Sequence, residues 1–159
     1  MTPVTVCLVM SYDRAFCYSE FMSNEDFYNF MNEKILAVIS TLSADGTPQA
    51  AVVGFGQTKD LEIVFGTNKS SRKYANITRD SHVAFVIGWE NGETIQYEGI
   101  ARELSSDELE IVRESYWKKN PRAEANYKEP SERHFIVKPT WIRYTNLKSE
   151  PWDIAELKF

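Results

Sequence analysis

The sequence has few of the residues that hold metals or disulfide frameworks. Its 159 residues include only two cysteines, Cys7 and Cys17, and two histidines, His82 and His134. A zinc site takes four ligands of these kinds, and a disulfide scaffold needs several cysteine pairs. The two cysteines could close one short loop, but free thiols in a cytoplasmic protein are the simpler interpretation. We therefore expect no metal centre.

Long hydrophobic runs and an excess of basic residues are also missing. No stretch reaches the ~20 uncharged apolar residues that a membrane helix needs. Eighteen Lys and Arg stand against 23 Asp and Glu, and the net charge of -5 disfavours nucleic acid as a partner, because phosphates require a basic face. Apolar residues at 43% and charged residues at 26% are typical of a globular protein. The sequence thus predicts one soluble domain with neither membrane nor nucleic acid as a partner.

The first 21 residues show no clean periodicity, whereas Met22 precedes a typical helix start. Ser23 is a favourable N-cap residue, and Asp26 follows three residues later, as in a weak capping box. Apolar residues then recur at helical spacing, which predicts a helix over about residues 24–34. We interpret residues 1–21 as an appendage and residues 22–159 as the domain.

The remaining sequence predicts six or seven antiparallel strands. Asp45-Gly46 between two strand-like segments is the strongest short hairpin signal. Gly99 inside a strand suggests a bulge or barrel corner, and Pro139 inside another suggests an edge or bulged strand. The expected strands are 35–42, 48–55, 61–65, 82–89, 94–104, 134–144 and 152–159, with helices from Ser70 or Ser71 to about Asp80 and from 105 to about 119. This order favours a mainly β fold, a small β-barrel with flanking helices.

The segment from Thr67 to Lys73 is the most informative part of the sequence. Arg72 and Lys73 fall in the first turn of a predicted helix, where the partial positive charge of the helix disfavours them unless an anion is bound. The hydroxyls of Thr67, Ser70 and Ser71 would complete a phosphate site together with backbone amides. The alternative is a solvated loop whose two basic residues pair with nearby carboxylates.

Two glycines within the second strand, Gly54 and Gly56, leave two interpretations open. They could allow a flat ligand to approach the backbone, or they could mark a bend of the barrel. Elsewhere no arrangement of nucleophile, base and acid is recognisable, and His82 fits a capping or hydrogen-bonded role after the helix end. The residues alone therefore leave both the phosphate site and the solvated loop open, and they indicate no catalytic group.

The segments Phe65–Ile77 (FGTNKSSRKYANI), Leu42–Pro48, Val83–Val86 and Glu98-Gly99 together resemble the FMN-binding split-barrel family related to pyridoxamine 5'-phosphate oxidase. The segment Phe135–Tyr144 resembles the smaller general-stress-protein branch of that family. The resemblance covers about residues 24–159. It implies a six- to seven-stranded antiparallel split barrel and a homodimer with FMN between the subunits.

Carried onto this sequence, the resemblance assigns the FMN phosphate to Arg72 and Lys73, with hydroxyl contacts from Thr67 and Ser71. It places the flavin ring along the second strand with main-chain contacts. The residues expected at the ring are Val52, Val53 and Gly54, with Gln96 and Thr94 as weaker candidates.

The sequence also departs from the true oxidases of this family. Those enzymes carry an Arg and a Lys on the second strand, and the corresponding positions here are Ala51 and Gly56. No equivalent of their C-terminal substrate-binding segment is found in residues 155–159. We therefore do not expect pyridoxamine 5'-phosphate oxidation. The two missing charges would weaken FMN binding or admit another cofactor, such as the deazaflavin F420.

The leading hypothesis is an FMN-dependent protein of redox type, which transfers hydride or electrons between FMN and a small molecule. A cofactor of this kind carries the difficult chemistry, which accounts for the missing acid, base or nucleophile. The alternatives are a non-catalytic flavin-binding or stress-related module, and a split barrel that uses F420 or haem.

Overall fold

Ser43, Asp45 and Gly46 build the predicted hairpin between β2 (Leu36–Leu42) and β3 (Pro48–Gln57). The Ser43 hydroxyl donates to the Asp45 carboxylate at 2.5 Å, and the Gly46 amide donates to the Ser43 carbonyl at 2.9 Å. Gly46 has φ of +81°, a conformation that glycine adopts without steric penalty. The turn therefore forms where the sequence predicts it.

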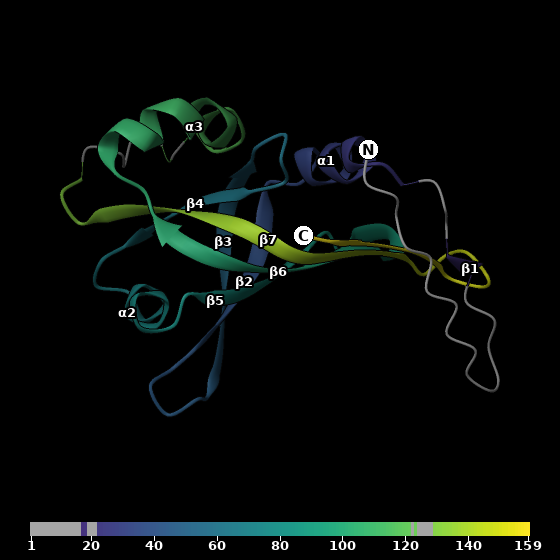
Figure 1. Ribbon diagram of the computed structural model, residues 1–159, viewed down its shortest axis with the longest axis horizontal. Coiled ribbons are helices and arrows are strands. Elements are labelled where there is room, and N and C mark those ends of the chain that lie inside the picture. Colours follow the sequence, from purple (N-terminus) through teal and green to yellow (C-terminus); the bar gives the residue numbers. More distant parts are fainter. Residues whose placement is uncertain (1–16, 19–21, 122, 124–128) are drawn as a thin grey trace.

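The computed structural model describes residues 17–18, 22–121, 123 and 129–159, and all strands belong to one sheet (Figure 1). The other elements are β1 (Cys17–Tyr18), α1 (Asn24–Asn32), β4 (Ile63–Asn68), α2 (Arg72–Arg79), β5 (His82–Ile87), the 3-10 turn η1 (Glu90–Gly92), β6 (Glu93–Glu103), α3 (Ser106–Lys119), β7 (Glu132–Asn146) and β8 (Asp153–Lys158).

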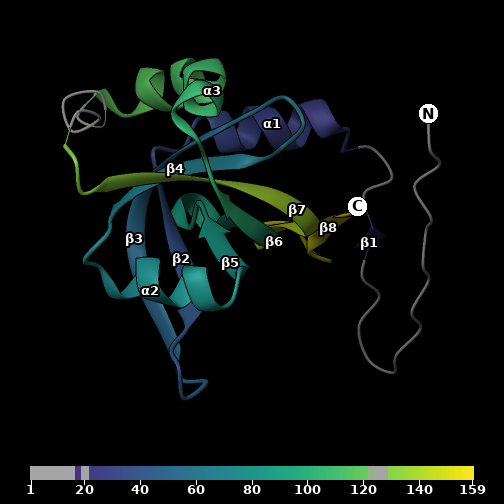
Figure 2. The ribbon, with the colours of Figure 1, turned by 60° about the vertical axis from the view of Figure 1, so that its left-hand side comes forward.

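Six strands close into an antiparallel barrel in the order β7-β4-β3-β2-β5-β6, and β6 returns to β7 (Figure 2). Strand β8 pairs with the second half of β7 outside this ring. The predicted mainly β barrel of six or seven strands is confirmed. The predicted appendage, residues 1–21, lies outside the described residues except for Cys17 and Tyr18, which pair in parallel with β8.

Pro139 lies within β7, for which an edge or a bulged strand was expected. The strand pairs with β6 from Phe135 onward, with β4 through residues 132–137 and with β8 through residues 141–146, so within the described residues Lys138 and Pro139 are paired on one side only. The predicted bulge is present, because the register between β6 and β7 shifts at Glu98/Gly99, opposite Pro139. At this interruption of the ladder the missing N–H of proline is tolerated.

The barrel interior is filled by large apolar side chains around Tyr97. This tyrosine is almost fully buried, and its hydroxyl lies 2.8 Å from the Val137 carbonyl and 3.1 Å from the Leu61 carbonyl. Burial raises the pKa of Tyr97, so the phenol stays protonated as a donor. Other fully buried side chains are Phe27, Met31, Phe55, Phe65, Phe85, Ile39, Leu61, Ile63, Ile87, Ile95 and Ile142.

Helices α1, α2 and α3 each begin after a serine that caps them. Ser23 and Asp26 form a reciprocal capping box at α1, and Ser105 and Glu108 form another at α3. Ser71 caps α2, which decides between the two serines considered for that role. Helix α3 then packs over the outer face of β3 (Figure 2).

The contact with α3 explains both glycines of β3. A Cβ atom on Gly56 would lie 2.5 Å from the Tyr116 Cα and 2.7 Å from the Ser115 carbonyl oxygen. A Cβ atom on Gly54 would lie 2.2 Å from the Asn120 side-chain oxygen. The two glycines therefore allow α3 to pack directly against β3. This role differs from the two considered from the sequence.

We expect Gly56→Ala to destabilise the fold by about 1–3 kcal/mol, because the added methyl group overlaps helix backbone that cannot move independently. Gly54→Ala is the matched control. There the Asn120 side chain can rotate away, at the loss of its 2.8 Å hydrogen bond to the Phe55 carbonyl, about 1 kcal/mol. Urea denaturation measures both. Equal costs for the two variants would contradict the proposed packing constraint.

Candidate functional site

The loop that leads into α2 is ordered by its own side chains. The hydroxyls of Thr67 and Ser71 are 2.9 Å apart, and the Ser71 hydroxyl also accepts from the Tyr74 amide at 3.2 Å. The Asn68 side-chain oxygen accepts from the amide of Ser70 at 2.9 Å and from its hydroxyl at 2.7 Å. The helix N-terminus is therefore held in place without a bound ligand.

The same loop is attached to the first residues of β7. The Asn68 side-chain amide donates to the Ser131 hydroxyl at 2.8 Å, and the Lys69 amide donates to the Ser131 carbonyl at 2.7 Å. In the ladder between β4 and β7, Thr67 is opposite Arg133 and Asn68 is opposite Glu132. Sequence reasoning did not bring this distant segment to the site.

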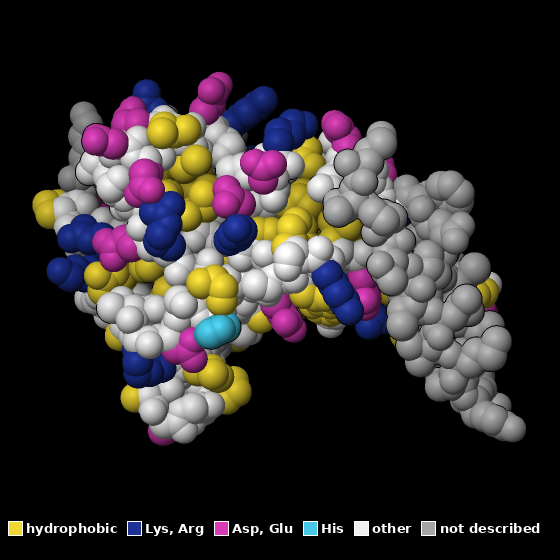
Figure 3. All heavy atoms as spheres, viewed as in Figure 1, with side chains coloured by type: hydrophobic (Ala, Val, Ile, Leu, Met, Phe, Trp, Pro, Cys, Tyr) yellow, Lys and Arg dark blue, Asp and Glu magenta, His cyan; other side chains and the backbone are white. Residues whose placement is uncertain are grey.

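Arg72 and Lys73 occupy the first turn of α2, which contains no acidic residue. Arg72 is exposed and Lys73 is half-buried. Among the described residues, no carboxylate lies within 4 Å of either cation, so the alternative of paired surface charges is not seen there. On the face shown in Figure 3, basic side chains gather at the end of the molecule that carries α2 and α3, with acidic side chains among them.

The residues expected at the flavin ring have different surroundings. Val52 points outward and is 60% exposed, whereas Val53 points into the core and is 6% exposed. Gly54 is covered by Asn120. Gln96 is exposed and Thr94 is half-buried.

The sheet register places Val52 and Gln96 in one row across the outer face. The row runs from Val52 to Val38 of β2, to Val86 of β5 and then to Gln96 of β6. The structure thus places one group of candidate residues at the N-terminus of α2 and another, Val52 and Gln96, on this face, whereas Val53 lies in the core and Gly54 beneath Asn120.

At the two positions where the oxidases carry basic residues, Ala51 and Gly56, the chain packs against other parts of the fold. Ala51 packs against the hydrophobic core. Gly56 faces the backbone of α3 at less than 3 Å from an added Cβ atom. A longer side chain at Gly56 would therefore overlap the backbone of α3.

A cluster of titratable side chains surrounds Gly66, the residue before Thr67. A Cβ atom on Gly66 would lie 2.6 Å from a Glu132 carboxylate oxygen, 3.1 Å from the Tyr116 hydroxyl and 3.3 Å from the His134 Nε2. Burial raises the pKa of Tyr116 to about 12 and lowers the pKa of His134. Burial also raises the pKa of Glu132, and the charge of Lys73 opposes that shift. The sequence signal for this cluster is limited to the glycine itself.

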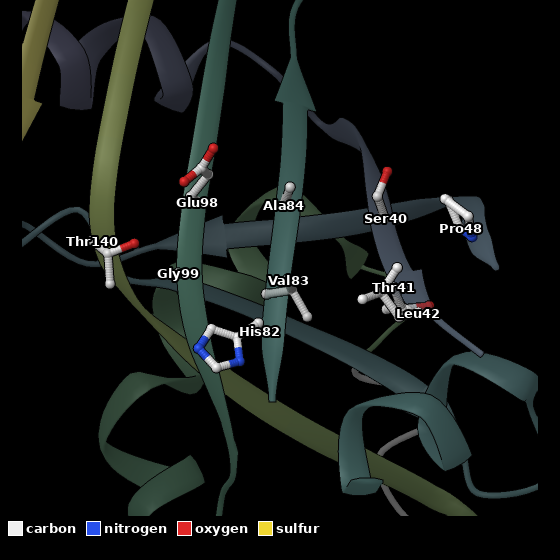
Figure 4. Close-up of a pocket in the computed structure, with 10 residues that line it drawn as sticks. All are labelled: Ser40, Thr41, Leu42, Pro48, His82, Val83, Ala84, Glu98, Gly99 and Thr140. Carbon is white, nitrogen blue, oxygen red and sulfur yellow. The ribbon is translucent and has the colours of Figure 1, made fainter. Parts of the chain in front are cut away.

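A shallow groove of about 270 Å³ lies on the outer face of the barrel (Figure 4). His82 stands at this groove, and its Nδ1 lies 2.8 Å from the Asp80 carboxylate, which also accepts from the His82 amide at 3.1 Å. This hydrogen-bonded arrangement is the one expected from the sequence. The groove is lined by Ser40, Thr41, Leu42, Pro48, His82, Val83, Ala84, Glu98, Gly99 and Thr140.

Among the described residues, no group of three or more His, Cys, Asp or Glu side chains is placed to hold a metal ion. In the same part of the chain, every helix is too short or too polar to cross a bilayer.

The most strongly perturbed amine belongs to Lys119, at the junction of α1, β3 and α3. Its ammonium donates to the Met31 carbonyl at 2.8 Å and to the Gln57 side-chain oxygen at 2.7 Å, and it lies 3.9 Å from the centre of the Phe55 ring. Burial lowers the pKa of Lys119 to about 7. Because its protons are directed to structural acceptors, we assign this lysine to the fold.

As the pH rises from about 7 to about 10, we expect the free energy of unfolding of the wild-type protein to increase relative to that of the Lys119→Met variant. Over this range the unfolded chain keeps a proton on Lys119 that the folded chain releases, so linkage favours folding with increasing pH. Urea denaturation between pH 6.5 and 9.5 measures the difference, with Lys118→Met at the exposed neighbour as control. Parallel profiles for wild type and Lys119→Met would contradict the lowered pKa.

The family model described as pyridoxamine 5'-phosphate oxidase matches residues 24–146. The chain therefore belongs to the pyridoxamine 5'-phosphate oxidase family, as the resemblance in the sequence predicted. It is 32% identical over 81 residues to the pyridoxine/pyridoxamine 5'-phosphate oxidase of Ehrlichia ruminantium (strain Welgevonden). That match covers 50% of this chain and 42% of the relative, less than half of its length.

Solved structures with the same fold carry different descriptions. A heme binding protein from Mycobacterium smegmatis has a TM-score of 0.74 at 14% identity, over 87% of this chain and 59% of that chain. General Stress Protein 26 from Bacillus anthracis str. Sterne has a TM-score of 0.64 at 19% identity, over 76% and 92%. A pyridoxamine 5'-phosphate oxidase-related, FMN binding protein from Nostoc punctiforme has a TM-score of 0.60 at 15% identity, over 79% and 87%. At these identities the similarity establishes the fold alone.

Proposed function

We propose that this protein binds FMN and that the N-terminus of α2 holds the phosphate group. The observation that carries the proposal is the pair Arg72 and Lys73, two cations in the first turn of a helix with no carboxylate of the described residues within 4 Å. The helix dipole adds partial positive charge at the same place. A dianionic phosphate is the type of group that stabilises this arrangement.

The residues around α2 fit the phosphate end of FMN. The hydroxyls of Thr67 and Ser71 already lie 2.9 Å apart, and the loop is attached to Ser131, the residue before β7. Little ordering is therefore needed on binding, which favours affinity. Along β3 the ring would lie near Val52, since Asn120 covers Gly54.

The outer face of the barrel supports a homodimer with the cofactor between subunits. Leu36, Val52 and Val86 are 48%, 60% and 40% exposed on neighbouring strands. Adjacent exposed apolar side chains of this kind favour association, and a second copy of the chain can present the same face about a two-fold axis. Gln96 at one end of the valine row would then lie at the subunit boundary.

FMN supplies hydride or electron transfer when it is bound, and the chain supplies the phosphate site and the apolar face. We therefore propose a redox protein acting on a small molecule. The alternative is a flavin-binding module without turnover. Oxidation of reduced nicotinamide by the FMN-loaded protein, compared with free FMN, separates the two functions.

One observation favours haem as a second candidate. His82 stands at the apolar groove with its Nδ1 held by Asp80, an arrangement that orients Nε2 of a histidine toward a metal ligand position. The visible absorption spectrum of the purified protein distinguishes the cases. Flavin bands support FMN, a Soret band that His82→Ala abolishes supports haem, and the separate spectrum of F420 would identify that cofactor.

We expect the double variant Arg72→Ala/Lys73→Ala to lose at least about 100-fold in FMN affinity, because each charge-assisted contact contributes about 1.5–3 kcal/mol. Fluorescence titration with FMN and with riboflavin measures the loss, which should be much smaller for riboflavin. Lys118→Ala/Lys138→Ala, at two exposed lysines, removes the same net charge as a control. Unchanged FMN affinity in the first variant would refute the phosphate site.

A charge in the apolar face should separate the subunits. We expect Val86→Glu to convert the dimer to a monomer in analytical ultracentrifugation, because an isologous interface would bury the new carboxylate twice. Ile111→Glu is the matched control, since Ile111 is 82% exposed on α3, away from this face. A wild-type monomer, or a dimer that tolerates Val86→Glu, would contradict the interface.

A further inference from the structure

The carboxylate of Glu132 lies beside the proposed phosphate site. In the ladder between β4 and β7, Glu132 is paired with Asn68 of the α2 loop. Its side chain reaches back over Gly66, so that one carboxylate oxygen lies 2.6 Å from the position of a Gly66 Cβ atom. Gly66 directly precedes Thr67, whose hydroxyl is hydrogen-bonded to the cap of α2.

This carboxylate is half-buried and faces a cation without forming a close ion pair. Within the described part of the chain, no Lys or Arg nitrogen is within 4 Å of it. The charge that acts on it is that of Lys73 in the first turn of α2. The other titratable groups that face it are Tyr116 of α3 and His134 of β7.

We propose that Glu132 competes with the phosphate group of FMN for Lys73, and so lowers the affinity of the site and makes that affinity depend on pH. The inference rests on the proposed function, because it requires a phosphate at α2. A carboxylate and a phosphate near one ammonium repel each other, and the repulsion ends when the carboxylate takes up a proton. Binding of the phosphate is then coupled to proton uptake at Glu132.

The direction of the pH effect follows from the surroundings of the carboxylate. Burial raises the pKa of Glu132, so it becomes neutral at a higher pH than an exposed glutamate. As the pH falls, the competition weakens and the site favours phosphate more strongly. Because phosphate monoesters also take up a proton near pH 6, the comparison is made between wild type and variant at each pH.

The test measures FMN and riboflavin affinity of wild type and Glu132→Gln by fluorescence titration from pH 5 to pH 8. We expect Glu132→Gln to bind FMN on the order of tenfold more tightly at pH 8, with riboflavin unchanged. The advantage should decline as the pH falls toward 5, because protonation of wild-type Glu132 removes the competing charge. The control is Glu25→Gln on α1. Glu25 forms an exposed ion pair with Lys59, so this variant removes one charge elsewhere and should leave FMN affinity unchanged.

A second variant ensures that the effect is assigned to the right cation. In a Lys73→Met background the gain from Glu132→Gln should disappear, and melting temperatures establish that each variant is folded. The inference about Glu132 would be overturned, and the proposed function left standing, if Glu132→Gln bound FMN no more tightly than wild type. An equal gain in riboflavin affinity would overturn it in the same way. If neither wild type nor Glu132→Gln binds FMN, the proposed function fails as well. Binding only by Glu132→Gln supports both.

Discussion

The pairing of β7 with strands on both sides is the constraint on which the rest of the structure depends. Without it the sheet would remain open, and Tyr97 would lose the Val137 carbonyl that accepts its buried hydroxyl. The closure brings two sheet segments so close that a Cβ atom on Gly99 would lie 2.5 Å from the Lys138 carbonyl oxygen. The bulge opposite Pro139 accommodates that approach. The same strand places Glu132 next to the loop before α2. Closure of the barrel therefore also brings together the residues of the candidate site.

Helix α3 imposes the second constraint, on the face of β3. Its contact with Gly54 and Gly56 is so close that neither position accepts a larger residue without displacement of a neighbour. In a barrel without this contact, basic side chains on β3 are possible, and they are part of the oxidase pattern that the sequence departs from. Here that face is occupied by protein. The positive charge available for a phosphate is therefore concentrated at the N-terminus of α2.

Local features of the fold were predictable from the sequence, and long-range ones were not. The Asp45-Gly46 turn, the serine caps and the strand positions follow from short patterns, because each depends on residues within four positions of one another. Pro139 predicted an edge or a bulged strand, and the bulge is present, but the pairing of β7 on both sides was not predictable because its partners lie far away in the chain. Strands β3 and β7 also extend two residues beyond their predicted C-terminal ends, where pairing with neighbours continues the ladder.

The candidate site was predictable to a similar degree. Thr67, Ser71, Arg72 and Lys73 are adjacent in sequence, and their pattern indicates an anion at a helix start. The carboxylate that opposes them comes from a residue 59 positions after Lys73, and no local pattern signals it.

The negative charge of Glu132 beside the positive charges of Arg72 and Lys73 determines which ligands the proposed site would bind. A helix N-terminus with two cations would retain any phosphate compound if no anion stood near it. With Glu132 at its side, a ligand that offers only a phosphate must overcome a repulsion, whereas a ligand that also contacts the apolar face gains compensating free energy there. The two groups of candidate residues, at α2 and around Val52, then act together. Under the proposed function, such a site would favour a molecule that joins a phosphate to a flat apolar ring system, as FMN does, over free phosphate.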